Sequence, residues 1–147
     1  MKSLTSSEKK KIINQLNEQY GITSLPYLLL QFGKEKVRLY SGNLSKEELK
    51  RLDTELNIEF AGMYFANIQD ENIRLTLDGL QLLKNQITKN ILEVDNKQKD
   101  DWFKGNDLDI QAMPSFKILK NNNEFIGCGK STGQKITNFV PKERRIK

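Results

Sequence analysis

The sequence predicts an α+β protein in which an α/β layer domain is followed by a small β-barrel. In residues 1–88, segments with helical spacing of apolar residues alternate with short strand-like runs, which is typical of layered folds. In residues 89–147, short strands separated by turns predominate, as in small barrels. No low-complexity linker separates the two segments, so we expect the two domains to pack together.

The first element expected is a helix that is capped by Ser6 or Ser7 and ends at Gly21. A capping box formed by Ser45 and Glu48 predicts the start of a second helix. The other elements expected in this domain are strands at residues 27–32, 37–39, 58–68 and 73–76 and a helix at residues 77–87. The aromatic residues of the segment 58–65 are assigned to the core, because no RNA-binding sequence pattern surrounds them.

The second domain is expected to begin with a strand at residues 91–94 and a charged helix at about 95–103. Asn121, Asn122 and Asn123 form a turn signal that predicts a hairpin. The expected strands of this domain are those at residues 91–94, from residue 108 onward, and at 115–119, 124–127 and 136–140. The glycines that we expect to interrupt the chain before the last strand are Gly127, Gly129 and Gly133.

The composition excludes several enzyme classes. The chain of 147 residues has no histidine and one cysteine, Cys128. Zinc sites built from Cys and His, Ser-His-Asp triads and Cys-His pairs are therefore excluded. We expect no catalytic residue, no metal site and no cofactor, and we expect Cys128 to be buried and inert. The sequence shows no bilayer-spanning apolar run and no signal-peptide pattern, which predicts a cytoplasmic protein without membrane contact.

The positive charge is confined to the C-terminal end of the chain. Residues 104–147 carry 9 Lys and Arg against 4 Asp and Glu, whereas residues 1–103 balance at 15 of each, so this end holds the whole net charge of +5. A charge excess on one side of a protein favours a polyanion-binding surface. A solvated basic tail is the other interpretation of the same residues.

Three short motifs occur in order in this basic region: residues 104–108 (Lys-Gly-Asn-Asp-Leu), 127–130 (Gly-Cys-Gly-Lys) and 138–145 (Asn-Phe-Val-Pro-Lys-Glu-Arg-Arg). Together with residues 88–95, this set resembles the PUA-like domain at the C-terminus of Nop/Sun-type RNA cytosine-5 methyltransferases. By general architecture, residues 1–87 resemble the pre-PUA domain that precedes a PUA domain in ribosome-biogenesis factors. The resemblance implies an α/β pre-PUA-like domain packed on a PUA-like β-barrel that binds structured RNA.

The sequence departs from those methyltransferases in its chemistry. It contains no glycine-rich S-adenosylmethionine loop, and Cys128 lies between two glycines rather than after a proline as the family's nucleophile does. The resemblance therefore implies an RNA-binding protein, not an enzyme, that acts on rRNA or tRNA in RNA modification or ribosome biogenesis. An accessory subunit that binds a separate RNA methyltransferase, or another ribosome-assembly protein, is the alternative. A small enzyme that uses carboxylates is a third and less favoured hypothesis.

Basic residues in these motifs are the candidates for RNA contact, because arginine binds phosphate in a bidentate manner and lysine supplies a point charge. Trp102 and Phe139 are assigned to the core rather than to base stacking. Glycines are included where the backbone is expected to approach a phosphate. The candidate RNA-binding residues are Lys104, Gly105, Gly129, Lys130, Lys135, Asn138, Lys142, Arg144 and Arg145. We expect the basic residues among them to lie on one connected surface.

Overall fold

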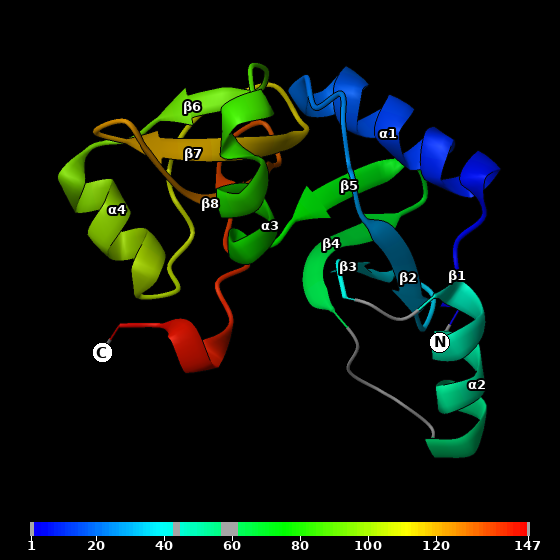
Figure 1. The fold of residues 1–147 in the computed structure, drawn as a ribbon. Helices are drawn as coiled ribbons and strands as arrows, with labels where there is room; N and C mark the ends of the chain where they lie inside the picture. The colour runs from blue at the N-terminus through cyan, green and yellow to red at the C-terminus, as the bar shows by residue number, and fades with distance from the viewer. Residues whose placement is uncertain (1, 43–44, 57–61, 147) are drawn as a thin grey trace. The chain divides into compact units, whose positions relative to one another are not determined.

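The computed structural model describes residues 2–42, 45–56 and 62–146, and for residues 52–56 it describes the backbone only. The chain divides into two compact units, Met1–Ile87 and Thr88–Lys147 (Figure 1). Each unit contains helices and its own β-sheet, so the expected α+β composition is confirmed.

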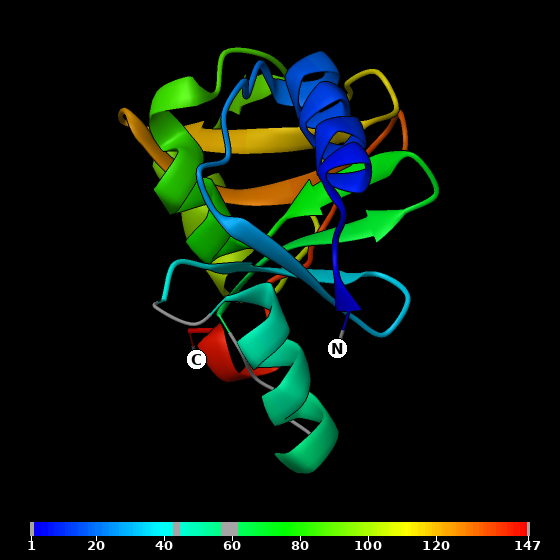
Figure 2. The ribbon, with the colours of Figure 1, turned by 45° about the vertical axis from the view of Figure 1, so that its right-hand side comes forward.

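The N-terminal unit is built on an antiparallel sheet of five strands in the order β1-β2-β3-β4-β5. In two views, α1 and α2 lie on opposite sides of these strands (Figures 1 and 2). Its elements are β1 (Lys2–Ser3), α1 (Ser6–Tyr20), β2 (Leu28–Phe32), β3 (Lys36–Tyr40), α2 (Lys46–Leu56), β4 (Met63–Gln69), β5 (Asn72–Leu75), α3 (Leu77–Leu83) and the 3-10 turn η1 (Lys84–Gln86).

The order of helices and strands after α1 is the one that the sequence predicts. Strand β1 was not predicted, because a two-residue strand has no hydrophobic period. The strand expected at 58–68 is described from Met63 onward, and residues 58–61 of the expected strand lie outside the described residues. The helix expected at 77–87 is α-helical only to Leu83 and continues as η1.

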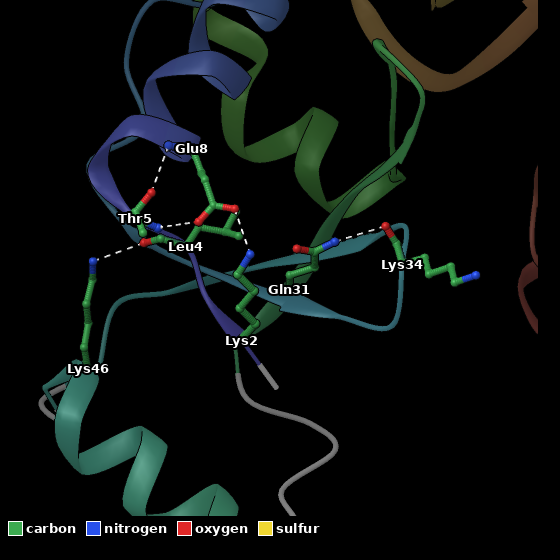
Figure 3. A network of polar contacts seen from close by, with 7 residues as sticks. All are labelled: Lys2, Leu4, Thr5, Glu8, Gln31, Lys34 and Lys46. Atoms are coloured by element: carbon green, nitrogen blue, oxygen red, sulfur yellow. Dashed lines mark hydrogen bonds and ion pairs between the residues drawn. The ribbon is translucent and has the colours of Figure 1, made fainter.

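The cap of α1 is Thr5, not Ser6 or Ser7. The Thr5 hydroxyl accepts a hydrogen bond from the Glu8 N–H, and the Glu8 carboxylate accepts one from the Thr5 N–H, which completes a capping box. Lys2 Nζ lies 2.9 Å from the same carboxylate, and Lys46 Nζ donates to the Leu4 carbonyl nearby (Figure 3). The bonds from Lys2 and Thr5 lower the pKa of Glu8 to about 2. The predicted C-cap is correct: Gly21 is left-handed, with φ 85°.

The C-terminal unit has a sheet of four strands in the order β6-β7-β8-β9, and the sheet curls into a half-barrel (Figure 1). The β6–β7 pair is parallel and the other pairs are antiparallel. The expected hairpin is β7–β8, and Asn122 and Asn123 form its turn with positive φ. The elements are β6 (Ile91–Glu93), α4 (Asn96–Phe103), β7 (Phe116–Asn121), β8 (Glu124–Ser131), β9 (Ile136–Thr137) and the 3-10 turn η2 (Lys142–Arg144).

Three strand predictions in this unit are wrong. Leu108 forms a single bridge with Ile136 rather than a strand, because the chain leaves the sheet after one pair of hydrogen bonds. Strand β9 ends at Thr137. Directly after it, the side-chain oxygen of Asn138 accepts a hydrogen bond from the Val140 N–H, in place of a strand partner. Strand β8 continues through Gly127 and Gly129 to Ser131, so these glycines do not interrupt it.

Candidate nucleic-acid interface

The candidate site lies next to a core residue, Trp102, on helix α4. Asp95 caps this helix in a capping box with Gln98, as its oxygen accepts from the Gln98 N–H at 2.7 Å. Trp102 is 1% exposed and belongs to a core cluster, as expected. The other buried members of this cluster are Val94, Leu108, Leu119, Ile126 and Ile136.

Gly127 and Gly129 are glycines because the indole of Trp102 lies on their backbone. A Cβ atom added to Gly127 would stand 2.5 Å from Trp102 Nε1, and one on Gly129 would stand 2.4 Å from Ile136 Cγ2 and 2.8 Å from Trp102 Cη2. Real Cβ atoms do not approach so closely. Gly129 is itself buried and paired with Lys117 across the sheet. Gly129 thus has a packing role in the strand, and its contact with a phosphate stays a prediction.

Residues 145 and 146 contact the last residue of α4 and the turn that follows it. Gly105 has φ 93°, a conformation that favours glycine, and its N–H donates to the Trp102 carbonyl. A Cβ atom on Gly105 would stand 2.5 Å from Arg145 Nε, so the arginine side chain lies directly against this glycine. Arg145 Nε donates to the Val140 carbonyl at 3.0 Å, and the Ile146 N–H donates to the Phe103 carbonyl at 2.8 Å. Gly105 thus serves the site by making room for Arg145.

Asn138 connects the turn to the C-terminal segment. Its Nδ2 donates to the carbonyls of Trp102 and Asn106, each at 2.8 Å, and its Oδ1 accepts from the Val140 N–H. Both amide hydrogens are therefore donated inside the protein, and none is left for a nucleobase. Asn138 thus has a structural role at this turn, and its contact with RNA stays a prediction.

Asp107 anchors Lys135 at the same turn. Its Oδ1 accepts from the Asn138 N–H at 2.8 Å, and its Oδ2 lies 3.2 Å from Lys135 Nζ. These two interactions, the backbone bond first, lower the pKa of Asp107. Lys135 is thereby held beside the turn, although the carboxylate offsets part of its charge.

The structure places three of the candidate cations, Lys104, Lys135 and Arg145, at residues 104–107, and two more, Lys142 and Arg144, lie in the segment directly before Arg145. Lys104 belongs to the turn, Arg145 lies against Gly105, Lys135 is paired with Asp107, and η2 directly precedes Arg145. Lys104, Lys135, Lys142, Arg144 and Arg145 are exposed residues, and we refer to these five as the turn cluster. Arginine and lysine side chains converging on one turn offer several phosphate contacts at once.

Lys130 is separated from the turn cluster. It pairs with Phe116 and Thr137 across the sheet, one position from Gly129, so it belongs to the sheet face opposite Trp102. Its Nζ lies 5.7 Å from the centre of the Phe116 ring, which packs on Phe139 at 6.3 Å between centroids. Phe139 is half-buried. That Lys130 joins the turn cluster in one RNA surface stays a prediction.

The sequence reasoning missed a second cation on this hairpin. Lys120 Nζ lies 5.8 Å from the centre of the Phe125 ring, across the β7–β8 pair. The alternation of Lys and aromatic residues in the hairpin was the available signal. Cys128 is buried, as expected.

Within the described residues, no group of three or more Cys, Asp and Glu is arranged to hold a metal ion. The helices in the part of the chain that the structure describes include none that is long and apolar enough to cross a membrane.

Comparison with known families identifies the C-terminal unit. Residues 89–146 match the family model described as the Methyltransferase RsmF PUA domain, which covers less than half of the chain. This segment is a PUA-type region that resembles those of Sun-type methyltransferases, and it includes α4, the β6–β9 sheet and the turn cluster. A search of curated proteins finds no match to the chain.

Proposed function

We propose that the chain is an RNA-binding protein whose C-terminal unit contacts RNA phosphates through the turn cluster. The observation that carries the proposal is the position of Lys104, Lys135 and Arg145 at the turn of residues 104–107 inside a PUA-type region. A PUA domain of a methyltransferase suggests RNA binding in a methyltransferase-related context. The remaining question is which residues of this chain bind the phosphates and what they recognise.

The chemistry of the turn cluster suits a polyanion with a fixed shape. Arg145 is held by its Nε bond to Val140, so its terminal N–H groups start from a defined position. Lys104 and Lys142 are exposed and supply additional point charges. Cations that a turn holds in place fit the phosphates of a folded RNA, whose spacing is fixed. They fit the phosphates of a flexible RNA less well, because that spacing varies. We therefore propose structured rRNA or tRNA as the ligand.

The proposed role of the chain is recognition in RNA modification or ribosome biogenesis in the cytoplasm, without catalysis of its own. The chain carries no histidine, and its single cysteine is buried on a strand. It therefore offers neither a histidine general base nor an exposed cysteine nucleophile.

The test is the salt dependence of binding to a tRNA and to an rRNA hairpin. Replacing Lys104 and Lys142 by alanine should weaken binding and flatten the slope of log K against log salt by about one unit per lost contact. Lys97→Ala, an exposed lysine near the start of α4, is the matched control and should leave binding unchanged. Equal affinities for the wild type and the Lys104/Lys142 variant would contradict the proposal.

Arg145 is a poorer position for this test. Its side chain is hydrogen bonded to Val140 and packs on Gly105, so Arg145→Ala alters the C-terminal segment as well as the charge. Loss of binding in that variant would not separate an RNA contact from a structural role.

A second candidate function is supported by the same family match, because the matched domain belongs to a methyltransferase. The chain would then act as an accessory subunit that binds a separate RNA methyltransferase or another ribosome-assembly protein. Co-purification of one methyltransferase in equal amounts before and after nuclease treatment supports this function. Loss of the enzyme after nuclease treatment supports direct RNA binding instead.

A further inference from the structure

Among the described residues, the two sheets have four edge strands, and three of these are closed or very short. An open edge presents unpaired N–H and C=O groups with which another chain can pair. Strand β5 is closed by the Gln19 side chain, which accepts from the Ile73 N–H. Strand β9 exchanges backbone hydrogen bonds of 2.8 and 3.1 Å between Ile136 and Leu108, and β1 has only two residues. Strand β6 is the remaining edge (Figure 1).

Strand β6 directs half of its backbone groups away from the sheet. It pairs in parallel with β7, and the Asn90 carbonyl and the Val94 N–H, just outside its two ends, each bond β7 at 2.8 Å. In a parallel ladder, alternate residues of a strand bond a given neighbour. Leu92 therefore bonds β7, whereas Ile91 and Glu93 point their N–H and C=O groups outward. In the part of the chain that the structure describes, these outward groups have no hydrogen-bond partner.

The side chains of this edge are accessible and partly apolar. Ile91 is 36% exposed, although it is a large apolar residue. Glu93 lies on the same face, two positions further on, and is exposed. Leu92 lies on the other face, where it is partly buried against the core cluster of Trp102. A strand that pairs with β6 therefore covers Ile91 and the open part of Leu92 as well as the backbone.

The charges at the two ends of β6 fit antiparallel pairing with a second copy of the chain. Lys89 precedes the strand, and Glu93 and Asp95 lie at its other end, all three exposed. In an antiparallel pair centred on Leu92, the basic end of one strand lies beside the acidic end of the other. Charged side chains on an edge normally discourage pairing. In this register, however, Glu93 faces Ile91 of the second copy rather than another carboxylate, so like charges are not opposed.

We propose that β6 is a self-association edge, at which two copies of the chain pair antiparallel and join their C-terminal sheets. Ile91 and Glu93 of one copy form hydrogen-bonded pairs with Glu93 and Ile91 of the other, and the two Leu92 side chains meet in the closer, non-hydrogen-bonded pair between them. So small a contact belongs to the weak, reversible interfaces, and we expect dimers at about 0.5 mM chain and monomers at about 10 µM. The proposal goes beyond RNA binding and uses no residue of the turn cluster.

Sedimentation equilibrium of the full chain over this concentration range tests the proposal, after nuclease treatment so that bound RNA does not link two copies. Glu93→Pro removes the outward N–H and places a ring on the edge, but it removes no hydrogen bond to β7. The association constant should fall about tenfold or more, because each hydrogen-bonded pair loses one of its two bonds. Glu93→Ala removes the same charge but keeps the N–H, so this matched control should retain most of the association.

Two results of the sedimentation experiment overturn the proposal. One is a chain that stays monomeric up to about 1 mM, well into the range of weak interfaces. The other is a dimer that forms equally well in the wild type and in Glu93→Pro, which places the contact on another surface.

Hydrogen exchange of the wild type decides even if Glu93→Pro does not fold. The amides of Ile91 and Glu93 should exchange more slowly in the concentrated sample than in the dilute one, because pairing protects them. Exchange rates that are independent of concentration contradict the proposal. Hairpin RNA binding by the Lys104/Lys142 variant tests the proposed function separately, so either proposal can fail while the other stands.

Discussion

Two buried side chains explain the glycines of strand β8. Trp102 lies against Gly127, and Ile136 and Trp102 lie against Gly129, so close that no other residue fits at either position without movement. Its Nε1 is buried and has no hydrogen-bond partner, so the indole is held by packing rather than by polar contacts. The backbone carbonyl of the same residue accepts a hydrogen bond from the Gly105 N–H, which connects the core with the turn that carries Lys104 and Gly105.

Gly127→Ala should destabilise the protein by about 1–3 kcal/mol, because the added methyl overlaps the indole. In the double variant with Trp102→Phe, the clashing Nε1 atom is absent, so the combined cost should be smaller than the sum of the two single costs. Urea unfolding of the wild type, both single variants and the double variant measures this coupling. If the two costs are strictly additive, the added methyl group does not press on the Trp102 indole.

The carboxylate of Asp107 should make stability depend on pH. Since the folded state lowers its pKa, the contribution of Asp107 is fully present above the unfolded value of about 3.9 and is lost as pH falls through the folded pKa. The stability advantage of the wild type over Asp107→Asn should therefore be constant between pH 7 and about pH 5 and shrink toward pH 3. Urea midpoints of both proteins at these three pH values test the trend. An advantage that persists undiminished at pH 3 would mean that hydrogen bonding, not charge, stabilises the turn.

At the scale of elements, helix α1 completes the edge of the N-terminal sheet. Strand β5 pairs with β4 on one side only. On its other side, Gln19 Oε1 accepts from the Ile73 N–H at 2.9 Å, and Gln19 Nε2 donates to the Ile73 carbonyl at 3.2 Å. The Tyr20 hydroxyl also donates to that carbonyl. The amide of Gln19 thus bonds the edge as a neighbouring strand would, which protects it from pairing with another chain.

Gln19→Ala should cost about 1–3 kcal/mol, because the N–H of buried Ile73 loses its partner. The variant should also aggregate faster on heating, since the β5 edge becomes available to other chains. Glu18→Ala, an exposed neighbour on the same helix, is the control. Thermal unfolding followed together with light scattering measures both effects. A variant as stable and as soluble as the control would show that Gln19 is dispensable.

At the scale of the whole molecule, the location of charge matters more than its amount. Lys10→Glu with Lys11→Glu and Lys104→Glu with Lys142→Glu lower the net charge of +5 equally. The turn-cluster pair should abolish hairpin RNA binding at moderate salt, whereas the α1 pair should weaken it only slightly through the long-range field. Binding of labelled hairpin at several salt concentrations distinguishes them. Equal losses in the two variants would indicate attraction by net charge without a defined site.

Local signals in the sequence determined much of this protein. The capping box at Ser45, the left-handed Gly21 and the asparagine turn of the hairpin act within a few residues, so helix α2, the end of α1 and the β7–β8 pair were predictable. The PUA-type region was recognisable from three short motifs, and the basic excess of residues 104–147 indicated a polyanion. Residue spacing and charge are properties of the chain itself and need no folded structure.

Tertiary structure alone decided the roles of particular site residues. Asn138 bonds atoms of residues 102 and 106, and Gly129 is required by an indole on another element, so neither role has a local signal. Which side chains share a face of the N-terminal sheet is set only when residues of β2, β3, β4 and β5 are brought into register. The physical reason is that helix caps and turns are formed by hydrogen bonds between residues close in the sequence. Close packing and the distribution of surface charge depend instead on which distant segments meet.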